Sequence, residues 1–394
     1  MSQAQLWTVY ELDCGGPGAT PRPTLSNAVK VLEHDSTLSG TIWYDEFLDR
    51  VMTGTPPREW RDADDLNLTV DLQDRIGIAA IPTRIVADAV QQYAHRRPRH
   101  LVRDWLTRLV WDGEPRCAMA FEEHWGVDTN EAQPCDYVRA VSQNFFVGLV
   151  ARVMRPGCQL DTMVVFEGEQ GTRKTSALRV LGGPFYAAVH ESVTSKDFFQ
   201  ALQGKWLVEI GELDSFTRAE VTRVKMVIST PVDTYRASYG RRVNDYPRQC
   251  MFAGTTNATE WGADETGLRR FWPVRCGEVN LATLGAAREQ LFAEAVALFG
   301  DGEAWWVVPS TAAGVQSDRQ QTHPWQEFIV PWLQGRAECS VPEVLTDCLK
   351  KAAGDLTMAD HHAAGRCLSL AGWSRRQVRL GGKVRKLWFP SVTP

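Results

Sequence analysis

In the stretch VVFEGEQGTRKTSALRVLGG, residues 164–183, Gly168, Gly171, Lys174 and Thr175 have a spacing that could bind phosphate. It follows the phosphate-binding-loop pattern G-x-x-x-x-G-K-S/T, except that Arg173 stands in place of the last glycine. In such a loop the glycines let the backbone approach a phosphate, the following helix offers its N–H groups, and the lysine reaches the β- and γ-phosphates. Two interpretations stay open, a nucleotide site or an ordinary strand-turn-helix. The first predicts a set of ATP-binding residues: Gly168, Glu169, Gln170, Gly171, Thr172, Arg173, Lys174, Thr175 and Ser176.

Carboxylates follow a second apolar run, KWLVEIGELD, at residues 205–214. In a nucleotide hydrolase, one carboxylate beside such a strand holds the water shell of Mg²⁺ and another polarises the attacking water. Side chains alternate faces along a strand, so Glu209 and Glu212 can share a face only if the strand ends between them, a bend that Gly211 allows. The alternative is surface charge at a strand end. The predicted metal ligands are Thr175, Glu212 and Asp214.

A polar amide and two arginines complete the candidate chemistry. Asn257 ends the apolar run in CMFAGTTNATEW and could orient a water molecule against the γ-phosphate, although Thr-Asn after a strand also suits a turn. Arg269 and Arg270, in DETGLRRFWPV, could reach the nucleotide site of a neighbouring subunit, or could instead pair with Asp264 or Glu265. The predicted catalytic residues are therefore Lys174, Glu209, Glu212, Asn257, Arg269 and Arg270.

The segments that must position these residues alternate between strand and helix. Between residues 160 and 276 four apolar runs, TMVVFEG, KWLVEIGE, QCMFAGTTN and RRFWPVR, are separated by helix-like stretches. This rhythm predicts an α/β domain built on a parallel central sheet. Residues 281–299 then form a strong amphipathic helix.

The two flanking regions differ from this core. Residues 1–150 place apolar residues at three- and four-residue spacing and are predicted to be mainly helical. Residues 318–394 hold short helices followed by two strand-like runs around Gly381-Gly382, a hairpin signal that favours a winged helix. The predicted domains are 1–150, 151–310 and 318–394.

Bulk composition limits the class of protein. The chain has 394 residues, 44% hydrophobic and 23% charged, which suits a globular protein of two or three domains. It has no apolar run long enough to span a membrane and no signal-peptide layout at its start. Nine cysteines without a C-x-x-C pair suit free thiols in a reducing cytosol. We therefore expect a cytoplasmic protein with no membrane partner.

Basic residues cluster at the C-terminal end although the net charge is −5. From Arg366 onward there are seven basic residues and no acidic ones. Such a cluster can bind phosphates, or it can be a solvated basic face. The first interpretation predicts DNA-binding residues in the C-terminal hairpin, namely Arg375, Arg376, Lys383, Arg385 and Lys386.

Five segments, in this order, resemble the virulence-associated protein E family of phage and mobile-element proteins: EGEQGTRKT, KWLVEIGELD, TYRASYGRR, YPRQCMFAGTTN and TGLRRFWPV. The resemblance spans roughly residues 25–310. It implies a superfamily 3 helicase of the AAA+ class, an ATP-dependent motor on DNA that is usually a hexameric ring and serves phage or mobile-element replication. It also implies that an arginine is tolerated before the lysine of the phosphate-binding loop.

The resemblance further implies a DNA-contacting β-hairpin between the acidic strand and the strand that ends in Asn257. Arginines with interleaved tyrosines suit tracking of a single strand. Arg241 and Arg242 are the favoured DNA contacts, whereas Arg236 and Arg248 could contact DNA or serve ATP across a subunit interface. Longer relatives carry a primase domain, so we expect priming to be absent here or supplied by a separate chain.

Three functions are candidates for this chain. The first is a DNA-dependent ATPase and helicase acting on single- and double-stranded DNA. The second is a nucleotide-gated DNA-binding switch, for origin recognition or phage interference, that hydrolyses ATP slowly and does not translocate. The third is a scaffold with a decayed site, and the joint presence of the loop, acid, amide and arginine residues argues against it.

Overall fold

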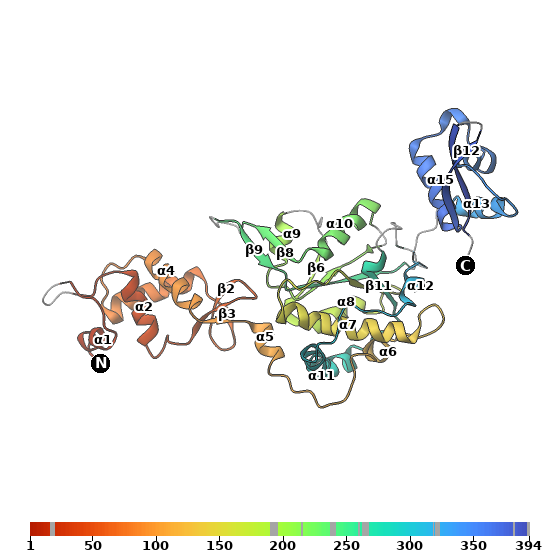
Figure 1. Ribbon diagram of the computed structural model, residues 1–394. Helices are drawn as coiled ribbons and strands as arrows, with labels where there is room; N and C mark the ends of the chain where they lie inside the picture. The colour runs from red at the N-terminus through yellow and green to blue at the C-terminus, as the bar shows by residue number, and fades with distance from the viewer. Residues whose placement is uncertain are drawn as a thin grey trace. The chain divides into compact units, whose positions relative to one another are not determined.

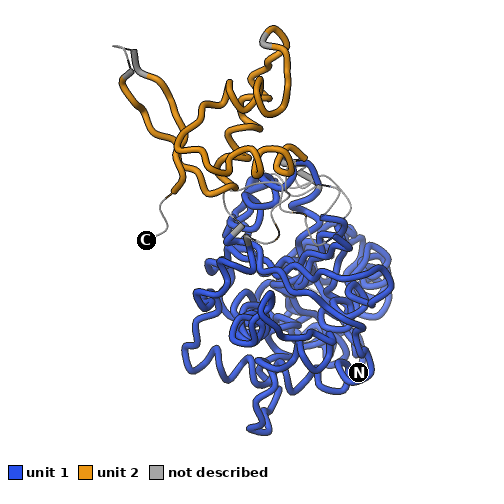
Figure 2. The backbone as a smooth tube through the Cα atoms, turned by 90° about the vertical axis from the view of Figure 1, so that its right-hand side faces the viewer, with its two compact units in different colours: residues 1–259, 266–317 blue, residues 260–265, 318–394 orange. Residues whose placement is uncertain are grey.

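The computed structural model describes residues 1–15, 20–189, 196–213, 216–236, 242–258, 261, 268–317, 319, 324–380 and 383–391, and Figure 1 labels its elements. The chain divides into two compact units (Figure 2). Unit 1 comprises residues 1–259 and 266–317, and unit 2 comprises residues 260–265 and 318–394. The division into three domains expected from the sequence stays a prediction.

The first hundred residues of unit 1 combine helices with a small sheet. Its strands are β1 (Ile42–Asp45), β2 (Arg50–Thr53), β3 (Arg58–Glu59) and β4 (Pro98–Arg99), in the order β3-β2-β1-β4. The sequence predicts a mainly helical region and does not show these strands, because strands of two to four residues are too short for a clear alternating pattern. The helical elements are α1 (Gln3–Val9), α2 (Leu25–His34), α3 (Asp62–Asp71), η1 (Leu72–Ile76) and α4 (Thr83–His95).

This region has its own apolar core, which extends from Tyr10 to Ala94. Thr24 is the N-cap residue of α2. Its hydroxyl accepts the N–H of Asn27 and so satisfies an otherwise unpaired donor. The helix then buries Val29, Val31 and Leu32 against α4 and the sheet.

A five-stranded parallel sheet forms the centre of unit 1, in the order β11-β5-β10-β7-β6. This confirms the predicted α/β fold with a parallel sheet. Four of its strands match the four apolar runs, and the edge strand β6 was not predicted. The strands are β5 (Met163–Glu167), β6 (Tyr186–Val189), β7 (Leu207–Ile210), β10 (Met251–Thr256) and β11 (Phe271–Arg275).

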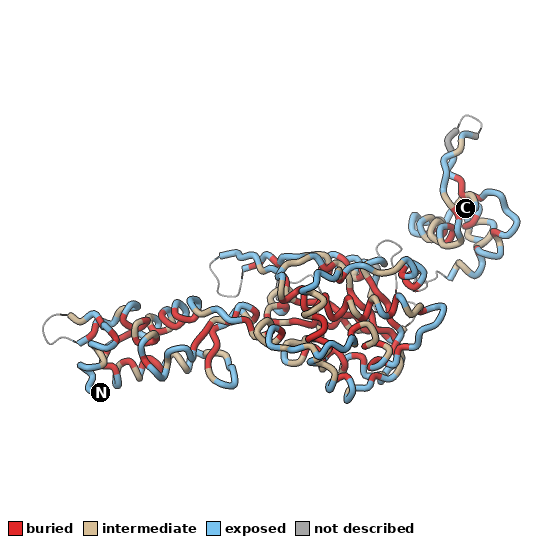
Figure 3. Tube along the Cα trace, turned by 60° about the horizontal axis from the view of Figure 1, so that its bottom comes forward, coloured by how far each residue is buried: buried red, intermediate tan, exposed pale blue. Residues whose placement is uncertain are grey.

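Helices cover both faces of this sheet (Figure 1). Val164 and Phe166 of β5 share one core with α7, α8 and α11, and Phe252 of β10 stacks against Phe198 of α9 on the other face. In Figure 3 the buried residues are concentrated in this part of unit 1. The helices are α5 (Leu101–Leu106), α6 (Ala120–Trp125), α7 (Cys135–Met154), α8 (Lys174–Gly182), α9 (Lys196–Ala201), α10 (Arg218–Ser229), α11 (Leu281–Gly300) and α12 (Ala312–Ser317), with the short turns η2 (Gly183–Phe185) and η4 (Leu268–Arg270).

An antiparallel hairpin joins α10 to β10. Its strands are β8 (Val232–Tyr235) and β9 (Asn244–Pro247). The hairpin lies in the segment where the family resemblance implies a DNA contact.

Unit 2 packs short helices against a long hairpin. Trp373 and Trp388, from the two strands, share a core with Ile329 and Leu368 from the helices. Cys339 forms an isolated bridge to Trp388 and extends the hairpin. The predicted strands pair antiparallel, and the predicted Gly381-Gly382 turn lies outside the described residues. The elements are α13 (Gln326–Leu333), α14 (Val341–Glu343), η5 (Val344–Cys348), η6 (Ala353–Asp355), α15 (Met358–Leu370), β12 (Trp373–Leu380) and β13 (Lys383–Pro390).

Two features agree with the composition. None of the helices in the described ranges has the length and apolar character needed to cross a membrane. All nine cysteines are free thiols.

A buried carboxylate ties α11 to a distant part of the chain. Glu294 is 3% exposed, and its Oε2 accepts the N–H groups of Arg116 and Cys117 at 2.5 and 2.8 Å. These backbone donors precede α6, so Glu294 fixes the entry to α6 and α7 against α11.

Replacing Glu294 by leucine should lower the free energy of unfolding by about 3 kcal/mol, because two buried N–H donors lose their acceptor. Glu289 lies exposed on the same helix, so Glu289→Leu should change stability by less than about 0.5 kcal/mol. Denaturant unfolding followed by tryptophan fluorescence measures both. Equal effects of the two substitutions would contradict the role given to Glu294.

Candidate functional site

The predicted loop, acidic and amide residues come together at one edge of the central sheet. β5, β10 and β7 are neighbouring parallel strands, so their carboxyl ends lie side by side. Gly168 follows β5, Asn257 follows β10 and Glu212 follows β7. The crevice outside the carboxyl ends of parallel strands is where α/β proteins bind ligands.

The glycine loop between β5 and α8 is shaped by its neighbours. Gly168 has φ 152°, and a Cβ there would lie 2.8 Å from the carbonyl oxygen of Cys276, so no other residue fits. Gly171 has φ 92°. The Thr172 carbonyl accepts the N–H of Val279 at 3.1 Å. The segment after β11 therefore holds the loop from one side.

Arg173 is the residue that departs from the sequence pattern, and it lies at the N-cap of α8. Its φ of 67° and ψ of 23° are left-handed, a conformation that costs an L-residue about 1–2 kcal/mol and glycine nothing. The backbone therefore adopts the conformation of the glycine in the pattern while keeping an arginine side chain.

The ammonium of Lys174 lies inside the loop. Nζ donates to the carbonyl oxygens of Gly168 and Glu169 at 2.7 and 2.9 Å and lies 3.2 Å from Thr172 Oγ1. It is also 3.4 Å from Oδ1 of Asn257, on the neighbouring strand end. The lysine is 7% exposed. A cation held at the amino end of a helix is an arrangement that can bind an anion.

Glu209 connects four elements beneath the loop. Its Oε1 accepts hydrogen bonds from Thr175 of α8 and Thr255 of β10 at 2.7 and 2.6 Å, and its Oε2 accepts one from Tyr186 of β6 at 2.5 Å. The carboxylate is 3% exposed. Burial, together with the hydrogen bond to Glu209, raises the pKa of Tyr186, which stays a donor. Sequence reasoning missed Tyr186 and Thr255, because no motif marks them.

Glu212 faces the same edge from beyond the strand. β7 ends at Ile210, between the two glutamates, and Glu212 is exposed with φ 54°. Asp214 lies outside the described residues. Within the described ranges, no group of three or more His, Cys, Asp or Glu side chains could hold a metal by itself. Mg²⁺ bound with a phosphate needs only one or two protein carboxylates.

Arg269 and Arg270 lie at the opposite edge of the sheet. β11 runs parallel to β5, with Phe271 opposite Met163 and Arg275 opposite Glu167. The two arginines precede β11, whose five residues span about 16 Å. They are therefore far from the loop of their own chain.

The surroundings of these arginines differ. Arg270 Nε donates to Ser229 Oγ, at the end of α10, at 2.9 Å, whereas Arg269 is exposed. Asp264 and Glu265, the alternative partners, lie outside the described residues.

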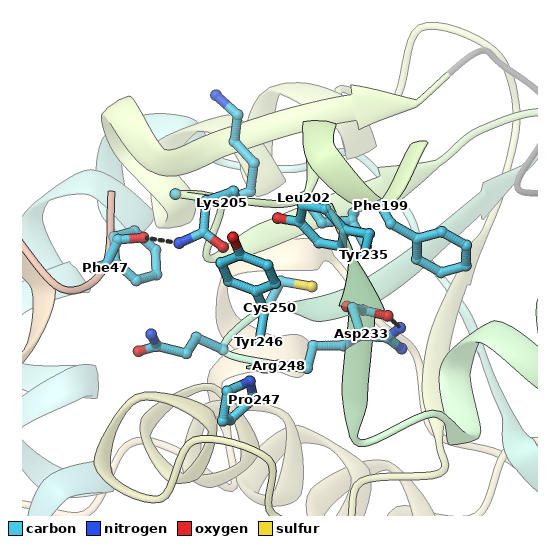
Figure 4. Close-up of a pocket in the computed structure, with 13 residues that line it drawn as sticks. Phe47, Phe199, Leu202, Lys205, Asp233, Tyr235, Tyr246, Pro247, Arg248 and Cys250 are labelled. Atoms are coloured by element: carbon cyan, nitrogen blue, oxygen red, sulfur yellow. Dashed lines mark hydrogen bonds and ion pairs between the residues drawn. The ribbon is translucent and has the colours of Figure 1, made fainter. Parts of the chain in front are cut away.

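The arginines of the β8–β9 hairpin have two different environments. Arg248 is buried at its base, where its guanidinium pairs with Asp233 (Figure 4). The same guanidinium also donates to the Val227 carbonyl. Arg236 and Arg242 are exposed beyond the strands, and Arg241 lies outside the described residues. Exposed positive charge on this hairpin therefore comes from its far end.

Two tyrosines and a lysine complete this region. Tyr235 stacks on Tyr246 with ring centroids 4.3 Å apart. Lys225 of α10 is buried, with its ammonium 5.8 Å from the centre of the Phe271 ring.

The hairpin of unit 2 carries its charge on both faces. Successive residues of a strand point to opposite faces, so the register places Arg375 and Lys386 on one face of the hairpin. It places Arg376 and Arg385 on the other face. These four side chains are exposed. Lys383 starts β13 opposite Leu380, and its side chain lies outside the described part of the structure.

Comparison with known proteins connects this geometry to a family. The family model of the virulence-associated protein E-like domain matches residues 106–324, more than half of the chain. No curated protein matches the chain. The match covers α6, α7 and the whole central sheet with the loop edge described above.

Similar solved structures include apo forms of the C-terminal region of NrS-1. One shares 12% identity with a TM-score of 0.47 and covers 89% of this chain and 95% of that one. Another shares 13% identity with a TM-score of 0.48 and covers 92% and 98%. A third shares 13% identity with a TM-score of 0.45 and covers 94% and 99%.

Because the two arginines have different environments, the same substitution should change the free energy of unfolding strongly at Arg248 and little at Arg242. Arg248→Met leaves Asp233 buried without its partner and should lower the free energy of unfolding by about 3–5 kcal/mol. Arg242→Met should change it by less than about 0.5 kcal/mol and should weaken binding of single-stranded DNA. Thermal unfolding and titration with a fluorescent oligonucleotide measure the two effects. If Arg248→Met melted at the wild-type temperature, the buried pair of Arg248 and Asp233 would not stabilise the fold.

Proposed function

The chain belongs to the virulence-associated protein E-like family, and we propose that it is an ATP-dependent DNA helicase of superfamily 3 type. The family membership and the groups at the carboxyl ends of the parallel strands support this proposal. In this proposal it acts in phage or mobile-element replication as a ring oligomer. The observation that carries the proposal is Lys174 inside the glycine loop, with Glu209 bonded to the adjacent Thr175 and with Asn257 and Glu212 at the same edge.

The loop and the start of α8 hold the phosphates of ATP in this proposal. Gly168 to Ser176 offer N–H groups at the positive end of the helix. Nζ of Lys174 exchanges its bonds to the Gly168 and Glu169 carbonyls for bonds to β- and γ-phosphate oxygens. ATP supplies the phosphoanhydride bond whose hydrolysis drives the motor.

Mg²⁺ is expected beside Thr175. The Thr175 hydroxyl donates a hydrogen bond to Glu209, so the lone pairs of its oxygen can face the cation. Glu212, exposed at the strand end, polarises the attacking water, and the Asn257 amide orients that water. Asp214 stays a predicted ligand of the metal's water shell.

The arginines at the far edge are proposed to act between subunits. Arg269 and Arg270 precede β11 and lie far from the loop of their own chain. A guanidinium at that edge can stabilise the transition state only in the site of another copy, which favours a ring. The hexameric number rests on the family resemblance.

Two surfaces are proposed to bind DNA. Arg236 and Arg242 are exposed cations in the described part of the β8–β9 hairpin and suit single-strand contact in the ring channel, and Arg241 stays a predicted contact there. Unit 2, with short helical segments followed by a basic hairpin, is proposed to be winged-helix-like and to contact duplex phosphates. Arg248 has a buried structural partner and is not part of this proposed surface. We further propose a cytoplasmic location.

A slowly hydrolysing, nucleotide-gated DNA switch is the second candidate, and the side chain of Arg173 within the loop favours it. Strand displacement separates the two functions. The helicase should unwind a forked duplex and hydrolyse ATP faster with single-stranded DNA, whereas the switch should bind DNA under control of nucleotide without unwinding it.

Lys174→Ala should reduce ATP hydrolysis by at least about 100-fold, because the ammonium is expected to offset charge as the terminal phosphate leaves. Lys205→Ala is the matched control, since Lys205 precedes β7 at the opposite edge, and it should hydrolyse ATP normally. Phosphate release with and without single-stranded DNA measures both. Unchanged turnover by Lys174→Ala, with its fold confirmed by circular dichroism, would refute the site.

Mixing two inactive variants tests the inter-subunit role of Arg270. Arg270→Ala should bind nucleotide without turnover, and Glu212→Gln should also be inactive. In mixed rings some interfaces combine an intact Arg270 with an intact Glu212, so hydrolysis should recover partially and depend on the mixing ratio. No recovery at any ratio, with mixed assembly confirmed by native mass spectrometry, would count against action between subunits.

A further inference from the structure

Arg173 has two unfavourable features that a glycine would not have. Its backbone is left-handed, with φ 67°, which disfavours an L-residue. It also places a cation at the N-cap of α8, the positive end of the helix dipole. Backbone strain retained beside a candidate site points to a role for the side chain.

In the described part of the structure Arg173 forms one ion pair, and that pair offsets little of the cost of the left-handed backbone and of the cation at the helix N-terminus. Its Nη2 lies 3.4 Å from Oε1 of Glu278, and the two side chains are 52% and 75% exposed. A pair so exposed is weak, because water competes for both charges. It can be exchanged for a stronger anionic partner at small cost.

Glu278 is anchored beside the loop. The next residue, Val279, donates its N–H to the Thr172 carbonyl at 3.1 Å, and the preceding Gly277 donates to the Gly126 carbonyl at 3.0 Å. A Cβ on Gly277 would lie 2.6 Å from that carbonyl oxygen, so the backbones are in close contact. The backbone of Glu278 is therefore fixed beside the loop, and the long side chain of Arg173 can turn away from its carboxylate.

We infer that Arg173 and Glu278 form a latch that responds to the phosphates of a nucleotide, an inference that rests on the proposed nucleotide site. With the loop empty, the guanidinium pairs with Glu278. A bound triphosphate supplies negative charge at the N-terminus of α8, and Arg173 turns from Glu278 to a phosphate oxygen. Both unfavourable features of Arg173 are then offset by the ligand, and Glu278 competes with the nucleotide for the same guanidinium.

The test measures, by calorimetry, how tightly the full chain binds the β,γ-imido analogue of ATP in the presence of Mg²⁺. This analogue is not hydrolysed at its terminal phosphate bond. Arg173→Asn removes the charge but keeps a residue that tolerates the left-handed backbone. Arg173→Gly removes charge and strain together. Both should bind the analogue about tenfold more weakly, as expected for a lost charge-assisted hydrogen bond, and should bind adenosine unchanged. Arg173→Gly should also melt at a higher temperature than wild type without nucleotide.

Glu278→Gln should tighten binding of the analogue about two- to threefold by releasing Arg173. The same change in the Arg173→Asn background should have no effect, which distinguishes a latch from general repulsion by Glu278. Arg223→Ala, an exposed arginine on α10, controls for the change in net charge and should bind as wild type does.

The outcomes separate this inference from the proposed function. If wild type binds the analogue, Lys174→Ala abolishes binding and both Arg173 variants bind as wild type does, the latch is wrong and the nucleotide site stands. An equal gain from Glu278→Gln in both backgrounds also overturns the latch. If wild type does not bind the analogue, the nucleotide site and the latch both fail.

Discussion

The buried carboxylate of Glu209 is the interaction on which the rest of the candidate site depends. It accepts three hydroxyl donors, from a helix, a central strand and an edge strand, while it is itself part of a fourth element. A carboxylate that is 3% exposed must have such donors, because burying it without them would be strongly unfavourable. The same bonds fix where α8 begins, so they also place Lys174 and the glycine loop over the sheet edge.

The sequence was sufficient where a local pattern dictates geometry. The glycine spacing and the Lys174-Thr175 pair located the loop, and the apolar runs predicted four of the five central strands. The sequence was insufficient where tertiary packing decides whether a side chain is buried and which partners it contacts. Arg248 and Arg242 look alike in the sequence, yet one is buried against Asp233 and the other is exposed. Tyr186 belongs to an edge strand with no motif, and its role appears only once β6 pairs with β7.

Parallel strands impose a polarity that organises the whole core. The glycine loop, Glu212 and Asn257 follow strands and lie at the carboxyl edge, whereas Arg269 and Arg270 precede a strand and lie at the amino edge. The same edge carries the base of the β8–β9 hairpin, because β9 leads directly into β10. One chain therefore presents two chemically different sides, and chemistry that needs groups from both requires a second copy.

The position of Lys174 has a consequence for ligand exchange in the proposed nucleotide site. Its ammonium holds the loop carbonyls of Gly168 and Glu169, so these hydrogen bonds define the shape of the loop. In the proposed site, binding therefore orders few additional backbone dihedrals, and release leaves no segment to refold. Exchange of one ligand for the next is then a change of hydrogen-bond partners around one amine and not a rearrangement of the loop.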